Sequence, residues 1–347
     1  THELGAQKHA YNLTITYKIT GAINVEKLKA SFHIIQKEQE IFRSYYQLVE
    51  GEPKMFIQED LIVDWEEKDL TIFSNPEEEA YQICQSEFSQ GFDLGVAPLF
   101  RIGLYKTGEN TCWISLMSHH ILMDGWSLRL FMELLLGYYE SDVILKNKTL
   151  QYKDFAHWQN KRLNGTFGEK LHQYWQKRFQ EPLQITALKQ KGKVLSVGET
   201  KLAFFSTEIF EPICKISDYY GCSNYQFLFG TFGAVLCHVR KSEEQLILFS
   251  DAGRVHPKLE KIIGFFINTL PFRYELQRKK SVQEMIKCIR NQILSDIEHA
   301  ELPLNDILQK IKNNEVPNKD LLTTRLVYND FDYGSQLKMK GIEGSEE

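Results

Sequence analysis

Clustered cysteines and blocks of one charge are both missing from this 347-residue sequence. Its six cysteines lie far apart and mostly inside apolar runs, with no Cys-x-x-Cys pair and no His/Cys cluster. This spacing fits neither a zinc site nor a disulfide framework, and it predicts buried free thiols in a reducing compartment. The net charge is −5 and no basic block occurs, which argues against a nucleic-acid partner.

Long uncharged runs are scarce as well. Cys222–Val239 lacks Asp, Glu, Lys and Arg, but it contains Ser, Asn, Gln, Gly and His, so we expect a buried helix and no membrane span. The first residues show no signal peptide. A Gly-x-Ser-x-Gly elbow, a P-loop, a Gly-x-Gly-x-x-Gly turn and a His-Glu-x-x-His helix are absent, which removes several common chemistries. A soluble, cytoplasmic protein is expected.

Strand and helix patterns alternate along the chain, which predicts a mixed α/β fold. The expected strands cover 11–19, 99–105, 111–117, 203–209, 245–249, 268–274 and 324–329, with a hairpin over 42–57. The expected helices follow Asn24 and Asn75, cover 128–139, 169–179, 211–220, 224–239 and 281–299, and resume at 304. Residues 145–168 are expected to form a connector. Two similar α/β units, joined near 145–180, predict two related lobes.

The most informative stretch is Ser118–Ser127, at the predicted change from strand to helix. Strand periodicity sends His119 and His120 to opposite faces, so only one of them can face a given cleft. Imidazole is well suited to exchange a proton near pH 7. Asp124 follows, and Gly125 allows close backbone approach. The spacing alone does not name a reaction, and a structural role for the histidines stays open.

This His-His-x-x-x-Asp-Gly stretch resembles the core motif of condensation domains of nonribosomal peptide synthetases, and of acyltransferases similar to chloramphenicol acetyltransferase (CAT). Four further stretches resemble signatures of that family, in the family's order: Glu40–Tyr46 with Arg43 at the family's arginine, Tyr152–Trp158, Ile263–Arg273 and His299–Leu304. Each alone fits core packing, but five in order are specific. The family's first motif and its last strands and helix are missing, so the resemblance implies a domain incomplete at both ends.

The resemblance implies two CAT-like α/β sandwich lobes in a V-shaped arrangement with a tunnel between them. Residues 1–165 would form the N-terminal lobe with the histidine motif, and 166–347 an incomplete C-terminal lobe. No cofactor or metal is bound by such a domain itself. Phosphopantetheine arrives covalently attached to an upstream donor and a downstream acceptor peptidyl carrier domain, and an adenylation domain is adjacent.

The implied activity is amide bond formation between a donor thioester and the α-amine of an acceptor. His120 is the expected proton acceptor or positioner, and His119 is expected to hold the loop by hydrogen bonds. Asp124 is implied to pair with an arginine, for which Arg254 is the first candidate and Arg273 the second. The backbone N–H of the glycine in the motif is expected to donate a hydrogen bond to the substrate or to the intermediate.

Three further residues are expected to line or support the tunnel, namely Trp126, Ser127 and Asn268, and Arg43 is expected to support the site. Two alternatives stay open. One is a CAT-like acyltransferase that uses coenzyme A, since both donors present the same pantetheine thioester. The other is a non-catalytic domain that recruits a partner protein. The Asp-Gly-Trp-Ser continuation resembles domains that join an L-configured donor to an L-configured acceptor.

Overall fold

The computed structural model describes residues 8–63, 65–141, 150–185, 205–311, 324–328, 338–339 and 342–346. The chain divides into two compact units, and neither is one continuous piece of sequence. Unit 1 comprises residues 1–159, 254–266 and 330–347, and unit 2 comprises residues 160–253 and 267–329. The segment 254–266 thus belongs to unit 1, although it follows a strand of unit 2. The expected CAT-like lobes over 1–165 and 166–347 stay a prediction.

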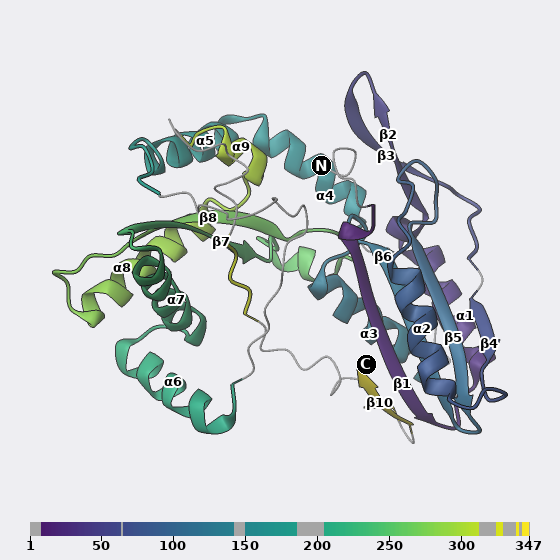
Figure 1. Cartoon of the computed structure of the whole chain (residues 1–347). Helices are drawn as coiled ribbons and strands as arrows, with labels where there is room; N and C mark the ends of the chain where they lie inside the picture. The colour runs from purple at the N-terminus through teal and green to yellow at the C-terminus, as the bar shows by residue number, and fades with distance from the viewer. Residues whose placement is uncertain are drawn as a thin grey trace, which may run out of the picture. The chain divides into compact units, whose positions relative to one another are not determined.

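A mixed sheet in the order β4-β5-β6-β1-β10-β9 forms the centre of unit 1 (Figure 1). Its strands are β1 (Asn12–Gly21), β4 (Glu66–Asp69), β5 (Phe100–Gly108), β6 (Thr111–His119), β9 (Lys338–Met339) and β10 (Ile342–Glu346). β4 and β5 run parallel, and the other described pairs are antiparallel. β6 lies between β5 and β1, and its residues 112–119 are all buried. The histidine motif therefore starts from a rigid, central strand.

Helices cover both faces of this sheet. The main core of unit 1 joins α1 (Val25–Glu38) and α3 (Gly125–Glu140) to one face. A smaller core lies under α2 (Pro76–Phe88) on the other face, where it contains Tyr105 and Trp113. Successive residues of β5 and β6 can belong to different cores, because side chains along a strand alternate between the two faces of the sheet.

The helix starts predicted after Asn24 and Asn75 are confirmed, and each of the two residues is the N-cap of its helix. Asn24 Oδ1 accepts a hydrogen bond of 3.0 Å from Lys27 N, and Asn75 Oδ1 accepts one of 3.5 Å from Glu78 N. Pro76 occupies the first turn of α2, where its missing N–H costs nothing.

The predicted hairpin is also confirmed, as β2 (Ser44–Val49) paired antiparallel with β3 (Glu52–Ile57). It turns at Glu50 and Gly51, which both have positive φ, of 55° and 80°. A short 3₁₀ helix, η3 (Glu40–Arg43), leads into β2.

The predicted connector over 145–168 is wrong in part. It contains α4 (Tyr152–Leu163) and the start of α5 (Thr166–Arg178), while residues 142–149 lie outside the described residues. α4 buries only Phe155 fully, so little of its sequence marks a buried helical face. The side chain of Gln151 ties α4 to α1, since its Nε2 donates to Glu38 O (3.2 Å) and its Oε1 accepts from Glu40 N (3.0 Å).

Unit 2 has an antiparallel pair of strands, β7 (Glu244–Asp251) and β8 (Asn268–Glu275), at its centre (Figure 1). Its other helices are α6 (Thr207–Tyr220), α7 (Asn224–Arg240), α8 (Val282–Glu298) and α9 (Leu304–Leu308). Its core contains the rings of Trp175 and Phe179 from α5 and its end, and those of Phe229 and Phe272 from α7 and β8.

Two predicted strands of unit 2 need correction. Residues 207–209, expected in a strand, begin α6, which has Ser206 as its N-cap residue and an acid in its first turn, where the helix dipole favours negative charge. Residues 203–204 lie outside the described residues. The strand expected at 324–329 is reduced to a single parallel bridge between Arg325 and Leu248, and residue 329 is outside the described part.

The uncharged run Cys222–Val239 forms most of α7, which buries Phe229, Gly230 and Cys237 in the core of unit 2, as expected. Among the described helices, none has both the length and the apolar character that crossing a membrane requires.

All six cysteines are free thiols. Cys84, Cys112 and Cys237 are buried, whereas Cys214 and Cys222 are partly exposed and Cys288 is exposed. The prediction of buried thiols is therefore confirmed for three of the six.

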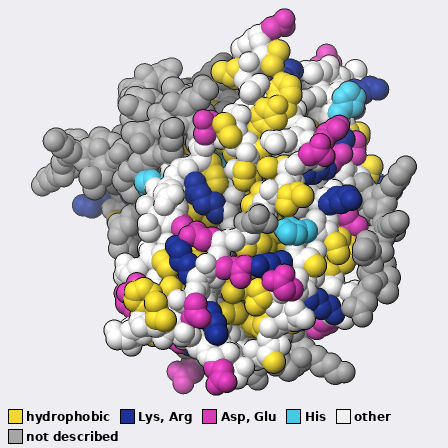
Figure 2. Space-filling view, turned by 90° about the vertical axis from the view of Figure 1, so that its right-hand side faces the viewer, with side chains coloured by type: hydrophobic (Ala, Val, Ile, Leu, Met, Phe, Trp, Pro, Cys, Tyr) yellow, Lys and Arg dark blue, Asp and Glu magenta, His cyan; other side chains and the backbone are white. Residues whose placement is uncertain are grey.

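Charges of both signs are interspersed over the face of unit 1 in Figure 2. Ion pairs on the surface of unit 1 include Lys18–Glu77 and Lys68–Glu66, each at 2.6 Å. Exposed pairs of this kind contribute little to stability, about 0–1 kcal/mol each. The stability of unit 1 therefore depends on its cores.

Phe32 is the centre of the larger core. It is 0% exposed, and its ring meets those of Phe42, Trp65, Phe100 and Phe131 with centroid distances of 5.7–6.5 Å. We expect Phe32→Ala to lower the free energy of unfolding by about 3–5 kcal/mol, because it leaves a cavity among these rings. Urea denaturation measures the loss.

Phe73→Ala is the matched control, because Phe73 is 44% exposed. It should change the free energy of unfolding by no more than about 0.5 kcal/mol. Equal losses for the two variants would contradict the assignment of Phe32 to the core.

Candidate functional site

The candidate site lies where β6 ends at His119 and α3 begins at Gly125. The helix starts there because Asp124 is its N-cap: Asp124 Oδ1 accepts a hydrogen bond of 2.8 Å from Ser127 N, and Leu128 N donates to Asp124 O at 2.9 Å. The predicted change from strand to helix across the motif is thus confirmed, and His120–Asp124 is the loop between the two elements.

His119 is buried and faces the interior of unit 1. Its Nδ1 lies 3.1 Å from the backbone N–H of Ile121, which donates to it, so that nitrogen carries a lone pair. The ring also lies near those of Tyr11 (5.8 Å) and Phe92 (6.4 Å). The hydrogen bond ties the His119 ring to the loop backbone at Ile121, and the role expected of His119 in the site stays a prediction.

His120 has different surroundings and is partly exposed. Its Nδ1 is 2.8 Å from the carbonyl oxygen of Met123. A carbonyl can only accept, so Nδ1 carries the proton and neutral His120 has its lone pair on Nε2. The imidazole also stands at 87° to the ring of Phe265, with 5.1 Å between centroids.

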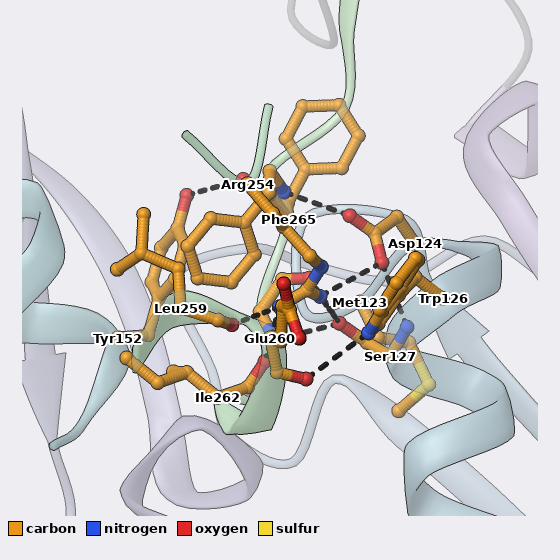
Figure 3. A network of polar contacts seen from close by, with 12 residues as sticks. Met123, Asp124, Trp126, Ser127, Tyr152, Arg254, Leu259, Glu260, Ile262 and Phe265 are labelled. Atoms are coloured by element: carbon orange, nitrogen blue, oxygen red, sulfur yellow. Dashed lines mark hydrogen bonds and ion pairs between the residues drawn. The ribbon is translucent and has the colours of Figure 1, made fainter. Parts of the chain in front are cut away.

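Asp124 is 2% exposed, and its carboxylate connects the motif to the segment 254–266 (Figure 3). Besides capping α3, it accepts a hydrogen bond of 2.9 Å from Phe266 N through Oδ2. Arg254 Nη2 lies 3.4 Å from Asp124 Oδ1. The expected pairing with Arg254, the first candidate, is therefore present in the structure.

Ser127 makes the second connection. Its hydroxyl donates to Gly264 O (2.7 Å) and accepts from Gly264 N (3.0 Å) and Arg254 Nη2 (2.7 Å). Every hydrogen-bonding capacity of this buried hydroxyl is thus used to hold the segment 254–266. A tunnel-lining role for Ser127 stays a prediction.

The side chain of Arg254 is only 3% exposed, and its guanidinium binds the segment on which it lies. Nη1 donates to Leu259 O and, at 2.9 Å, to Ile262 O, and the guanidinium stacks over Phe266 at 4.1 Å. Burial lowers the pKa of Arg254 and Asp124 opposes this shift. The group stays charged, because the ordinary pKa of arginine lies far above 7.

Trp126 covers Arg254 from the first turn of α3. Its Nε1 donates to Glu260 O at 3.0 Å, and its ring faces the guanidinium of Arg254 at 5.5 Å and that of Arg129 at 5.0 Å. Trp126 is therefore the third residue, after Asp124 and Ser127, that attaches the segment 254–266 to the start of α3 (Figure 3).

Three predicted site residues have partners elsewhere. Arg43 donates to Gln58 O (3.2 Å), Glu59 O (2.9 Å) and carbonyls at the end of α1, which joins the foot of the hairpin to that helix. Two belong to unit 2. Arg273 pairs with Glu244 and, at 3.2 Å, with Glu275.

Asn268, the other residue in unit 2, donates through Nδ2 to two backbone carbonyls, Ala300 O and Leu302 O, at 2.7 Å each. It therefore joins two of the motif stretches, Ile263–Arg273 and His299–Leu304. Its placement in a tunnel stays a prediction.

Two contacts of His120 were not foreseen from the sequence, namely those to Met123 and Phe265. The first is a backbone carbonyl and gives no signal in the sequence. The second joins residues 145 positions apart, but Phe265 lies in a stretch already marked by its resemblance. Among the described residues, no group of three His, Cys, Asp or Glu side chains is arranged to hold a metal ion.

Solved structures share this fold. The condensation domain of the Monacolin K polyketide synthase MokA matches with a TM-score of 0.81 and 16% identity, over 99% of this chain and 82% of that chain. The four-domain nonribosomal peptide synthetase holo-AB3403 matches with a TM-score of 0.76 and 16% identity, over 89% of this chain and 24% of that chain. The chain thus has the α/β, CAT-like fold of condensation domains, as predicted.

The sequence match gives the family. A family model described as Condensation domain matches residues 1–345, so the chain belongs to the condensation-domain family, as its five motif stretches indicated. Malpinin synthetase of Mortierella alpina is 25% identical over 328 residues. That match covers 89% of this chain but 4% of the synthetase, so this chain spans a small part of the relative's length.

The network at Asp124 generates a stability prediction. Asp124→Ala leaves the charge of Arg254 buried without its carboxylate and removes the acceptor of Phe266 N. We expect the free energy of unfolding to fall by about 3–5 kcal/mol, measured by urea denaturation. Asp124→Asn keeps the shape and one acceptor and should cost less, about 1–3 kcal/mol.

Glu133→Ala is the control on the same helix, because Glu133 makes an exposed ion pair of 2.8 Å with Arg129. It should cost no more than about 0.5 kcal/mol. A loss as small as this for Asp124→Ala would show that the carboxylate does not hold the segment 254–266.

Proposed function

We propose that this domain forms an amide bond between a donor acyl group, held as a thioester on one carrier protein, and the α-amine of an aminoacyl group on a second carrier protein. The proposed setting is nonribosomal peptide synthesis in the cytoplasm. The observation that carries the proposal is the hydrogen bond from His120 Nδ1 to Met123 O, which leaves the lone pair of neutral His120 on Nε2.

The reaction transfers one acyl group and moves one proton. The amine nitrogen attacks the thioester carbonyl carbon, a C–N bond forms, and the C–S bond breaks. The nitrogen loses a proton and the departing sulfur gains one, so atoms and charge balance. His120 Nε2 is proposed to accept the proton from nitrogen or to hold the amine by a hydrogen bond, and an imidazolium so formed can protonate the thiolate.

Orientation is proposed to supply much of the rate. A neutral amine is already a nucleophile, so holding it beside the thioester replaces an encounter in solution by a reaction within one complex. The Asp124 and Ser127 contacts keep the loop around His120 in one conformation, which such positioning requires.

The developing negative charge on the carbonyl oxygen needs hydrogen-bond donors. Gly125 is the first residue of α3, and the N–H groups of a first helical turn have no acceptor within the helix. We assign the Gly125 N–H as a donor to the substrate or intermediate, because the helix N-terminus also favours negative charge.

The proposed partners are an upstream donor carrier domain, a downstream acceptor carrier domain and an adjacent adenylation domain. The four-domain synthetase whose chain this fold matches over 24% of its length supports such a setting. The phosphopantetheine arms belong to the carriers and enter as part of the substrates.

A reconstituted condensation assay with loaded donor and acceptor carriers tests the proposal. His120→Ala should lower kcat by about 10²–10⁴-fold if the imidazole transfers the proton, and by less if it only positions the amine. His157→Ala is the control, because His157 is an exposed imidazole on α4, and it should keep the activity of the intact protein.

Three outcomes count against this proposal. Full activity of His120→Ala removes the proposed role of the imidazole. Turnover with acyl-coenzyme A in place of the donor carrier favours a CAT-like acyltransferase. An intact protein that binds its cognate carriers and forms no amide favours a domain that only recruits partners.

A further inference from the structure

A second side chain, outside the histidine motif, reaches His120 through one intermediate residue. Tyr152, at the start of α4, donates its hydroxyl proton to the carbonyl oxygen of Phe265 at 2.8 Å (Figure 3). Phe265 in turn places its ring against the imidazole of His120, at 5.1 Å between centroids. A chain of two contacts therefore runs from α4 to His120, and every member lies in unit 1.

The ring of Tyr152 also packs closely against the segment 254–266. A Cβ atom at Gly264 would lie 2.1 Å from Tyr152 Cδ2, so only glycine at that position allows the ring to lie there. The ring also meets Phe266 at 86° with 5.4 Å between centroids. Burial raises the pKa of Tyr152, which keeps the hydroxyl protonated and able to donate.

The backbone on both sides of Phe265 is fixed as well. Ser127 binds Gly264 N and Gly264 O, and Asp124 accepts from Phe266 N. The Phe265 carbonyl is held by Tyr152. Residues at the starts of α3 and α4 thus bind the peptide groups on both sides of Phe265. These bonds fix the backbone from which the Phe265 side chain extends, although Phe265 is 36% exposed.

His120 needs a second support of this kind. Its hydrogen bond to Met123 O fixes the position of Nδ1, but a single bond leaves the ring free to tilt about the line from Nδ1 to the oxygen. Contact with the Phe265 ring on another side opposes that tilt. The direction of the Nε2 lone pair therefore depends on both contacts.

We propose that Tyr152 is a positioning residue for the condensation reaction: its hydrogen bond to the Phe265 carbonyl holds the Phe265 ring against His120 and so sets the direction of the His120 Nε2 atom. This inference rests on the proposed function for its effect on the rate, but its structural step does not. Loss of the hydroxyl should reduce kcat, because misplacement of a reacting group by about 1 Å can cost on the order of 10²-fold.

Tyr152→Phe tests the proposal, since it keeps the ring on Gly264 and removes only the hydroxyl. In the carrier-based assay we expect kcat to fall about tenfold while KM changes by less than about twofold. In 15N spectra of the histidine-labelled protein, the His120 ring signals, assigned as those lost in His120→Gln, should shift.

Tyr274→Phe is a closely matched control in unit 2. The Tyr274 hydroxyl also donates to a backbone carbonyl, Gly230 O at 3.0 Å, and its ring also lies on a glycine, Gly233. Both variants should lose a similar free energy of unfolding, about 1 kcal/mol. Only Tyr152→Phe should change kcat and the His120 signals.

A double-mutant cycle tests whether Tyr152 acts through Phe265. Phe265→Ala alone should lower kcat and shift the His120 signals, and adding Tyr152→Phe should change either little further. Fully additive effects on kcat would overturn the proposed route, as would an equal loss of kcat in Tyr274→Phe.

The spectra separate this inference from the proposed function. If the intact protein forms no amide with any carrier pair, the proposed function fails, and the His120 signals alone decide the structural step. Unchanged His120 signals in Tyr152→Phe overturn the inference whether or not the protein is active.

Discussion

The structure around the candidate site depends on one buried carboxylate. Asp124 caps α3, accepts from Phe266 N and pairs with Arg254, so a single side chain joins the histidine loop to a segment more than a hundred residues further along the chain. A buried carboxylate is tolerated only when such partners compensate for its lost hydration. The same requirement makes the site cohesive, because the partners that neutralise Asp124 also place the segment 254–266 beside His120.

The assignment of 254–266 to unit 1 follows from this carboxylate and its neighbours. Arg254 binds the carbonyls of Leu259 and Ile262, which folds the segment on itself, and Ser127 and Trp126 attach the folded segment to α3. Trp126 and Ser127, which were expected to line or support the tunnel, thus bind the backbone of the segment 254–266. The part of the motif that we propose for catalysis is narrower: it consists of His120, with its lone pair on Nε2, and of Gly125, the first residue of α3.

Much of this was visible in the sequence. The motif predicted a strand that ends in a loop and a helix that follows it, because strand alternation and helical periodicity are local properties of a few residues. The capping of this helix by Asp124 was found in the structure. Arg254 was the first candidate partner for Asp124 because it lies in a Gly-Arg stretch that precedes the Ile263–Arg273 motif. The contacts of His120 with Met123 and Phe265 were not predictable, since one involves a backbone carbonyl and the other depends on how two distant loops meet.

Two of the wrong predictions concern segments that bury little. α4 buries a single side chain fully, and the residues near 324 touch β7 at one bridge. The periodic spacing of apolar residues in a sequence reflects which side chains an element buries. An element that buries few side chains therefore gives a weak signal in the sequence.

The central claim is that neutral His120 carries its lone pair on Nε2, and 15N NMR of the histidine-labelled protein at alkaline pH measures this most directly. The structure predicts a protonated Nδ1 and an unprotonated Nε2 for the His120 signals, because Nδ1 donates to Met123 O. A signal pair with the proton on Nε2 would contradict the account, since no lone pair would then face away from Met123.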